Sequence, residues 1–314
     1  MQDHGKDGGW KGGRKDGQAP LYGRAETLEP GLRRVLARNP SGMTFQGTNS
    51  YILGEGAVAV IDPGPDDPAH LAALLGALGP GERVSHILVT HAHRDHSGLA
   101  RALARATGAP VLAFGDAQAG RRPLMQQLAA AGGLPGGEGA DAGFVPDLRL
   151  ADGARIEGQG WALSAHHTPG HFGNHLCLAW GDAIFSGDHV MGWSSSVVAP
   201  PDGDMGAYMA SLHRLAGLGA GRLYPGHGRS VEAPATRIAA LIRHREGRAL
   251  AILNALEGGP SDARTLAAAI YVDTPAALMP AAALNVFSQL IDLEERNQVR
   301  SEGGLRFSTR FRLA

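Results

Sequence analysis

The chain has 314 residues, of which 43% are hydrophobic, enough to bury the core of one large domain or of one large and one small domain. Its formal net charge is -1, so no overall field favours nucleic acid, and a single cysteine, Cys177, excludes an intrachain disulfide and a thiolate metal cluster. No uninterrupted apolar run reaches the roughly 18 residues of a membrane span, and the first 20 residues contain no apolar secretion signal, so we expect a cytoplasmic protein.

The first half of the chain predicts a tail followed by strands and helices. Residues 1–20 are rich in Gly, Lys and Asp, and they carry too few apolar side chains to repay the entropy of ordering, so we expect a disordered tail. Short β-rich runs closed by Gly or Pro predict strands in 49–64 and 84–91, and 95–108 has a helical pattern. Residues 120–142 are rich in Gly and Ala and predict a helix with a mobile loop that borders the site.

The second half repeats this order and then changes composition. Strands are expected in 161–171, 175–180, 182–188 and 222–228, with a helix over 205–218 before the last strand. From about Thr236 the pattern predicts helices in 236–260, 262–271 and 281–299, and a hairpin over 299–313 that turns at Gly303-Gly304. We therefore expect a first domain over 21–235 and a small winged-helix-like domain over 236–314.

Residues 90–98 read THAHRDHSG, which places three histidines and an aspartate within six positions after an apolar run. With 14 histidines in the chain, chance would give this histidine spacing at about one in 10,000 starting positions. His91 and His93 are two residues apart, so both side chains of an extended segment point to the same face and can share a metal. Asp95 and His96 would then begin the next helix.

Three further candidate ligands stand at predicted strand ends, each after a glycine that lets the backbone bend sharply. They are His171 in TPGH, Asp188 in SGDH and His227 in PGHG. Histidine and carboxylate ligands suit zinc, iron and manganese. The sequence therefore predicts a metal site at the edge of a sheet.

The motifs HAHRDH, TPGH, SGD and YPGHG, in this order and each after an apolar strand, resemble the ligand motifs of the metallo-β-lactamase superfamily over about residues 25–235. That resemblance implies an α/β fold, an αββα sandwich with a dinuclear metal centre along one edge of its two sheets. It further implies that His91, His93 and His171 bind the first metal, that Asp95, His96 and His227 bind the second, and that Asp188 bridges the two.

A narrower resemblance concerns NPSGMTFQGTNSYIL, GDHVMGWSSS and the C-terminal segment, which are similar to the β-lactamase-like protein 2 branch, whose members append a winged-helix-like domain. Activities in that branch and its relatives include cleavage of single-stranded RNA and hydrolysis of acyl-carrier thioesters. Because one fold carries several chemistries, the resemblance alone leaves the substrate open.

The expected activity is that of a dinuclear zinc-dependent hydrolase with two Zn²⁺ per chain, Fe or Mn being possible, in which a metal-bridging hydroxide attacks and Asp95 and Asp188 are catalytic. A small acyl thioester or ester is favoured over single-stranded RNA because the net charge is not basic. Two alternatives of other classes are an iron-dependent sulfur dioxygenase and a non-catalytic nucleic-acid-binding module with a structural metal. Neither a membrane partner nor a defined oligomeric state is indicated.

Several residues near these motifs have a structural and a functional interpretation. Asp62 either supports a ligand histidine or caps a turn. The serines at 194–196 either line the pocket or belong to a polar loop, and His167 is interpreted as a residue that packs or that supports a ligand, and not as a ligand itself. Packing or surface roles are also expected for four other histidines: His166, His175, His189 and His213.

The C-terminal hairpin is basic, with five arginines against Glu302 in the last 19 residues. With Phe307 and Phe311 between the arginines, it could follow a phosphate backbone. A charged edge strand whose phenylalanines face the core is the favoured interpretation.

Overall fold

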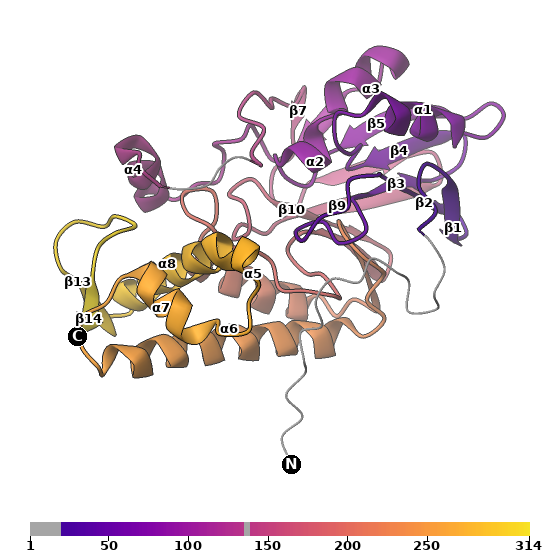
Figure 1. The fold of residues 1–314 in the computed structure, drawn as a ribbon. Helices are drawn as coiled ribbons and strands as arrows, with labels where there is room; N and C mark the ends of the chain where they lie inside the picture. The colour runs from indigo at the N-terminus through magenta and orange to yellow at the C-terminus, as the bar shows by residue number, and fades with distance from the viewer. Residues whose placement is uncertain (1–19, 135–138) are drawn as a thin grey trace.

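The computed structural model describes residues 20–134 and 139–314, so the tail predicted over 1–20 lies outside the described residues except for Pro20. The first of two large sheets has seven strands, which are ordered β1 to β7 as in the sequence (Figure 1). Its strands are antiparallel from β1 to β4 and parallel from β4 to β7. They are β1 (Ala25–Glu29), β2 (Leu32–Leu36), β3 (Asn49–Leu53), β4 (Ala57–Ile61), β5 (Arg83–Leu88), β6 (Val111–Ala113) and β7 (Leu148–Arg149).

A five-stranded sheet with the order β12-β11-β10-β9-β8 packs against the first. It is antiparallel except for the parallel pair β11 and β12, which are joined through a helix. Its strands are β8 (Arg155–Gly158), β9 (Trp161–His167), β10 (Leu176–Trp180), β11 (Ala183–Gly187) and β12 (Arg222–Pro225). The strands expected in 161–188 and 222–228 are therefore confirmed.

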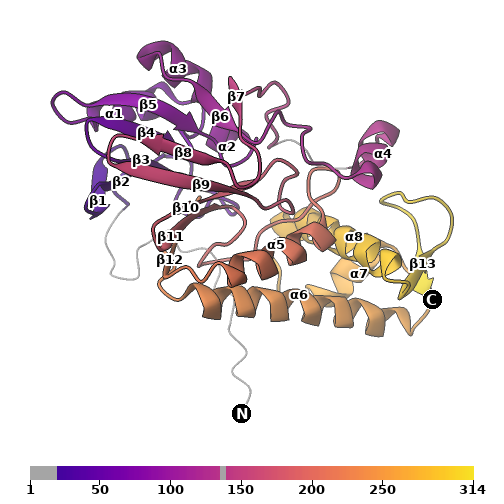
Figure 2. The same ribbon diagram turned by 180° about the vertical axis from the view of Figure 1, so that it is seen from behind.

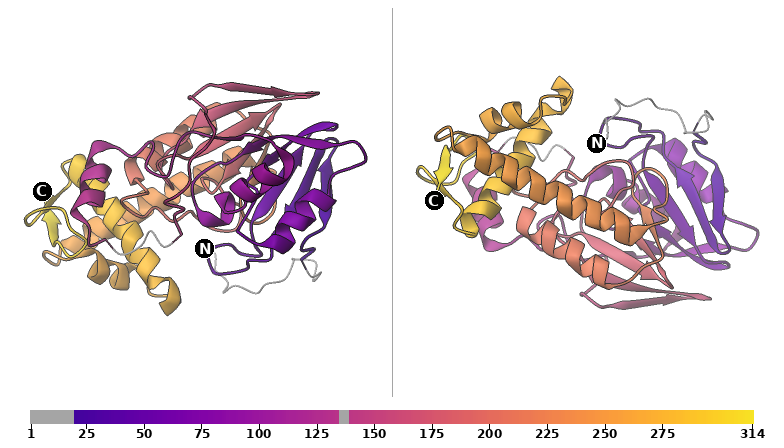
Figure 3. Two further views of the ribbon diagram at one scale, coloured as in Figure 1. Left: turned by 90° about the horizontal axis from the view of Figure 1, so that it is seen from above. Right: turned by 90° about the horizontal axis from the view of Figure 1, so that it is seen from below.

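Alternating burial along the strands explains the layers. In β4, Val58 and Val60 face helices α1 (Pro68–Gly76) and α3 (Ala100–Thr107), whereas Ala59 and Ile61 face the second sheet. On the second sheet, Phe185 faces the first sheet, and its neighbour Ile184 faces helices α5 (Met205–Gly217) and α6 (Pro234–Leu256). The result is the predicted αββα sandwich (Figures 2 and 3).

Two helical predictions need refinement. The helix expected over 95–108 is divided into α2 (Arg94–Ser97) and α3, because the Leu99 amide donates to Gly64 O, in the loop after β4, at 3.0 Å. The helix expected in 120–142 is α4 (Pro123–Ala131), and residues 135–138 of that segment lie outside the described residues. Beyond that gap, Gly139 O accepts from the Arg94 amide at 2.8 Å, so the segment does border the predicted site.

The C-terminal region contains α7 (Ala263–Ile270), the 3₁₀ helix η1 (Ala276–Leu278), α8 (Met279–Glu295), β13 (Val299–Ser301) and β14 (Phe311–Leu313). These elements stand at one end of the sandwich (Figure 3). The hairpin is present, but residues 302–310 connect its strands, a longer connection than the predicted turn at Gly303-Gly304. Within this connection Phe307 packs into the C-terminal core, which a two-residue turn at Gly303-Gly304 would leave no room to do.

Helix α6 belongs to two apolar cores. Ile238 and Leu241, in its first half, pack with the second sheet and α5, whereas Ile252 and Leu256, near its end, pack with α7, α8 and the hairpin. The predicted domain boundary at 235/236 falls within the first turn of this helix and stays a prediction.

Among the described residues, one helical segment, Ala276–Glu295, is long and apolar enough to cross a membrane by length and composition, although the sequence has no uninterrupted apolar run of that length. Of its apolar window, 61% is buried inside the protein. Phe287, Leu290 and Ile291 pack in the C-terminal core, which is the pattern of a core helix.

Candidate metal centre

The seven predicted ligands meet at one edge of the two sheets because each follows the carboxyl end of a strand. His91 and His93 follow β5, His171 follows β9, Asp188 follows β11 and His227 follows β12, while α2 carries Asp95 and His96. The three glycines that precede His171, Asp188 and His227 are required sterically, and a Cβ at Gly170 would lie 2.4 Å from the backbone Cα of Tyr208. Gly187 has φ +48°, and a Cβ at Gly226 would lie 2.4 Å from Asp188 Oδ1.

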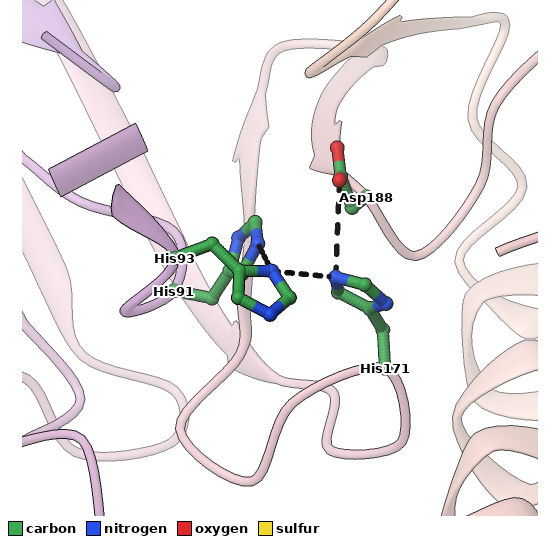
Figure 4. A group of neighbouring side chains, drawn as sticks. All are labelled: His91, His93, His171 and Asp188. Atoms are coloured by element: carbon green, nitrogen blue, oxygen red, sulfur yellow. Dashed lines mark hydrogen bonds and ion pairs between the residues drawn. The ribbon is translucent and has the colours of Figure 1, made fainter. Parts of the chain in front are cut away.

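The first cluster consists of His91, His93, His171 and Asp188 (Figure 4). His93 Nδ1 lies 2.9 Å from His91 Nε2 and 3.0 Å from His171 Nε2, and His171 Nε2 lies 3.8 Å from Asp188 Oδ2. Ligand nitrogens of a tetrahedral zinc ion, at 2.0–2.1 Å from the metal, are about 3.3 Å apart. The spacing of the three ring nitrogens therefore fits one shared cation.

The second cluster consists of Asp95, His96 and His227. Asp95 Oδ2 lies 3.4 Å from His96 Nε2 and 3.3 Å from His227 Nε2. Asp188 also faces this cluster, because its Oδ2 lies 3.2 Å from His227 Nε2 and its Oδ1 lies 3.5 Å from His96 Nε2. The carboxylate of Asp188 thus stands between the two clusters, where a bridging ligand would be.

Hydrogen bonds at the opposite ring nitrogens orient four of the histidines. His171 Nδ1 donates to Val197 O at 2.6 Å, and His227 Nδ1 donates to Gly47 O at 3.2 Å. His96 Nδ1 donates to Asp62 Oδ2 at 2.9 Å. His91 Nδ1 lies 3.0 Å from Thr90 Oγ1, which itself donates to Asp62 at 2.8 Å and so accepts from His91. In each case the bond fixes a proton on Nδ1, so the neutral form of the ring presents a bare Nε2 to the clusters, as a metal ligand requires.

Two supporting side chains complete this arrangement. Asp62, for which the sequence left two roles open, is 2% exposed and accepts from His96, from Thr90 Oγ1 and from the Thr90 amide, so it orients a predicted ligand histidine. Thr48 was not singled out from the sequence, and its hydroxyl donates to Asp95 Oδ2 at 3.0 Å. The sequence feature that could have indicated Thr48 is the GTNS motif, in which it follows Gly47, whose carbonyl accepts from His227.

The two clusters differ in charge. Burial, reinforced by neighbouring histidines, lowers the pKa of His93 to about 3 and also lowers the pKa values of His91 and His171, so these rings are neutral donors. Burial acts in the same direction on His227, but the carboxylates of Asp188 and Asp95 outweigh it and raise the pKa of His227 to about 9. The second cluster therefore holds negative charge that a cation would neutralise.

The donor set fits a pair of transition-metal ions. His96 Nε2 and Asp188 Oδ1 are buried and have no hydrogen-bond partner, an arrangement that is costly unless a ligand satisfies these atoms. Five imidazoles and two carboxylates supply borderline nitrogen and hard oxygen donors, which suit zinc, iron or manganese.

The other histidines stay outside the clusters. The ring of His167 stacks on Phe114 with centroids 3.7 Å apart, as expected of a packing residue. His175 and His189 are fully buried behind the first cluster, His175 with its centroid 5.1 Å from that of His91. His213 is exposed.

The basic hairpin has its aromatic side chains inside. Phe307 and Phe311 are buried in the C-terminal core, where both rings pack edge-on against Phe287. Arg300, Arg306, Arg310 and Arg312 are exposed. This confirms the charged-edge interpretation.

Comparison with known families agrees with the fold. The metallo-β-lactamase superfamily matches residues 43–227, more than half of the chain, and a β-lactamase-associated winged helix domain matches residues 263–307. The chain therefore belongs to the metallo-β-lactamase superfamily and carries a winged helix domain in its C-terminal region.

Several relatives span most of the chain. It is 33% identical over 280 residues to the β-lactamase-like protein 2 homolog of Drosophila melanogaster, covering 87% of this chain and 91% of that protein. It is 31% identical over 266 residues to atrochrysone carboxyl ACP thioesterase of Aspergillus fumigatus, covering 83% of this chain and 76% of that protein. A metallo-β-lactamase family protein from Thermus thermophilus superposes with a TM-score of 0.74 at 25% identity, covering 92% of this chain and 100% of that one. The chain is thus an enzyme, a metal-dependent hydrolase of this superfamily.

Proposed function

We propose that this enzyme is a dinuclear zinc hydrolase of acyl thioesters or other small esters. The observation that carries the proposal is the position of Asp188, whose Oδ2 lies 3.8 Å from His171 Nε2 and 3.2 Å from His227 Nε2. One ion would be held by His91, His93 and His171, and the other by Asp95, His96 and His227. Asp188 would contact both ions. Two bound ions would supply a hydroxide near neutral pH, by lowering the pKa of a shared water from 15.7 to about 7, and would polarise the scissile carbonyl.

The chain's own contribution is orientation and charge. Asp188 is almost fully buried among histidines of both clusters, so its carboxylate would keep both halves of the site at a fixed separation. The side chain of Asp95 is 25% exposed, and Thr48 holds its Oδ2. A carboxylate at the solvent side of the site can accept a hydrogen bond from the attacking water and orient it toward the acyl carbon.

Two observations favour an acyl substrate over single-stranded RNA. A relative that aligns with 83% of the chain is named as an acyl-carrier thioesterase. The phenylalanines of the basic hairpin are buried in the C-terminal core, so they are not available as platforms on which unpaired bases stack. RNA cleavage is therefore the second candidate, and it would rest on the exposed arginines alone.

A substrate panel tests the proposal. Purified full-length protein with added Zn²⁺ is assayed on an acyl N-acetylcysteamine thioester by thiol release, on a single-stranded oligoribonucleotide by fragment analysis, and on glutathione persulfide by oxygen uptake. The proposal expects thiol release that is lost on chelation and returns with zinc. Cleavage of RNA without thiol release would support the second candidate, and oxygen uptake with iron would replace the hydrolase by a sulfur dioxygenase.

A further inference from the structure

The loop that follows Asp188 connects two of the proposed ligands. We call residues 189–198 the Asp188 loop. The loop begins directly after Asp188 and folds back on itself. The hydroxyl of Ser196 shares its proton between the carbonyl of Asp188 and that of His189, the latter at 3.1 Å. One residue later, Val197 O accepts from His171 Nδ1 at 2.6 Å. The conformation of this loop therefore sets the direction of both the Asp188 carboxylate and the His171 ring.

Side chains from the C-terminal helices hold the backbone of this loop. Arg237 of α6 donates from Nε to Met191 O at 2.7 Å and from Nη2 to Ser194 O at 2.6 Å. Arg245, two turns further along α6, donates from Nη2 to Ser196 O. Asn285 of α8 accepts at Oδ1 from the Val198 amide at 2.9 Å and from Arg245 Nη1 at 3.3 Å.

Arg245 is unusual for a buried cation. It is 2% exposed, and no carboxylate pairs with it in the part of the chain that the structure describes. Its guanidinium instead contacts the Ser196 carbonyl, the Asn285 amide and the ring of Tyr208, whose centroid is 5.2 Å from Cζ. Tyr208 OH in turn donates to His189 O at 3.1 Å. A planar guanidinium with fixed donors is suited to holding backbone carbonyls in one arrangement.

We propose that Arg245 and Asn285 are positioning residues for the metal centre, and that through the Asp188 loop the C-terminal helices fix the aim of Asp188 and His171. The inference rests on the proposed function, since it requires that the two clusters bind metal. It assigns the C-terminal region a part in the metal site, in addition to its own core. Arg245 and Asn285 act through backbone contacts only, and neither is a ligand.

The test compares two arginines of the same helix in the full-length protein. Arg245→Met removes the bonds to Ser196 and Asn285 while keeping an apolar stem of similar length. Arg248→Met is the matched control, because Arg248 bonds to Ile270 O at 3.3 Å and stacks on Tyr271 without touching the loop. The measurement is Zn²⁺ affinity by competition with a chromophoric chelator, with thermal unfolding of the metal-free proteins recorded beside it.

We expect Arg245→Met to lower the affinity for zinc by roughly 10- to 100-fold, the usual effect of losing a residue that orients a metal ligand. Arg248→Met should leave zinc affinity within about two-fold, whatever it does to thermal stability. If both variants lose metal-free stability alike and both keep the wild-type zinc affinity, Arg245 is merely structural and the inference is wrong. Absence of zinc binding in the wild type would instead contradict the proposed function.

Asn285 provides a second test if Arg245→Met does not fold. Asn285→Ala removes the acceptor for the Val198 amide and should weaken zinc binding. Asn285→Asp keeps an acceptor oxygen at the same place and should restore zinc binding. Equal zinc affinities in both variants and the wild type would overturn the inference.

Discussion

His96 donates from Nδ1 to Asp62 Oδ2 at 2.9 Å, and both side chains are buried. The same carboxylate accepts from the amide and hydroxyl of Thr90, at 2.7 and 2.8 Å. Because Thr90 Oγ1 also accepts from His91, Asp62 orients one histidine of each cluster. This single residue, at the end of β4, therefore links the geometry of the two proposed metal sites.

Asp62→Asn should weaken zinc binding by roughly 10- to 100-fold. The Asp62 carboxylate accepts three hydrogen bonds, and the NH₂ group of asparagine, which can only donate, would replace one of its two oxygens. Competition with a chelator measures the affinity. The control is Asp67→Ala, which removes the N-cap of α1 and should cost about 1 kcal/mol of stability without changing zinc affinity. An Asp62→Asn variant with wild-type zinc affinity would show that the Asp62 bonds do not matter for the metal.

Asp188→Asn should abolish hydrolysis and reduce the metal content, because the neutral amide leaves two cations facing each other without shared negative charge. Thioester turnover and elemental analysis of the same preparation provide the measurements. His167→Ala serves as the control, since His167 stacks on Phe114 outside both clusters and its loss should change turnover by no more than a few fold. An Asp188→Asn enzyme with near-normal turnover would place the reaction elsewhere.

The clustering of the predicted ligands could be predicted from sequence because these residues are encoded locally. Each follows an apolar strand, and glycine precedes His171, Asp188 and His227, so short segments carried both the residue type and its position at the sheet edge. The alternating faces of β4 and β11 likewise encode the sandwich layers.

The contacts that orient the ligands were not predictable in this way. Asn285 meets Val198 across 87 positions, and Arg245 meets Ser196 across 49. Neither pair has a spacing or residue pattern that distinguishes it from a surface helix and a polar loop. Ser196, which the sequence left between a pocket residue and a polar loop, is 1% exposed and bonds backbone carbonyls. Only the packing of α6 and α8 against the Asp188 loop shows its role.

Charge reversal of the hairpin separates the two candidate substrates. Replacing Arg306, Arg310 and Arg312 by Glu should leave thioester turnover within about two-fold, because the change lies outside both clusters. Circular dichroism checks that the C-terminal region still folds. If RNA were the substrate, each lost phosphate contact should reduce the slope of log affinity against log salt by roughly 0.7. A large loss of thioester turnover in the folded variant would contradict the acyl proposal.

His70 should make stability depend on pH. Burial lowers its pKa to about 4, its Nδ1 has no partner, and Ser50 Oγ lies 2.9 Å from Nε2. The unfolded chain, with a histidine pKa of about 6.5, binds more protons than the folded one between these values. The free energy of unfolding is therefore not reduced by His70 above pH 6.5, and it falls as the pH is lowered toward 4.

The size of this effect follows from the two pKa values. Between about pH 7.5 and about pH 5, His70 should account for roughly 2 kcal/mol of lost stability. His70→Gln should reduce the difference between the urea unfolding free energies at these two pH values by that amount. An unchanged difference would mean that His70 keeps its ordinary pKa in the folded chain.

Metal stoichiometry tests the dinuclear centre most directly. The full-length protein is purified without chelators, dialysed against metal-free buffer and analysed for zinc, iron and manganese against its concentration from amino-acid analysis. The proposal predicts close to two ions per chain with zinc predominant, and about one or fewer after Asp188→Asn, because two clusters share that carboxylate. A single tightly held iron in the wild type, or no transition metal at all after supplementation with zinc, would contradict it.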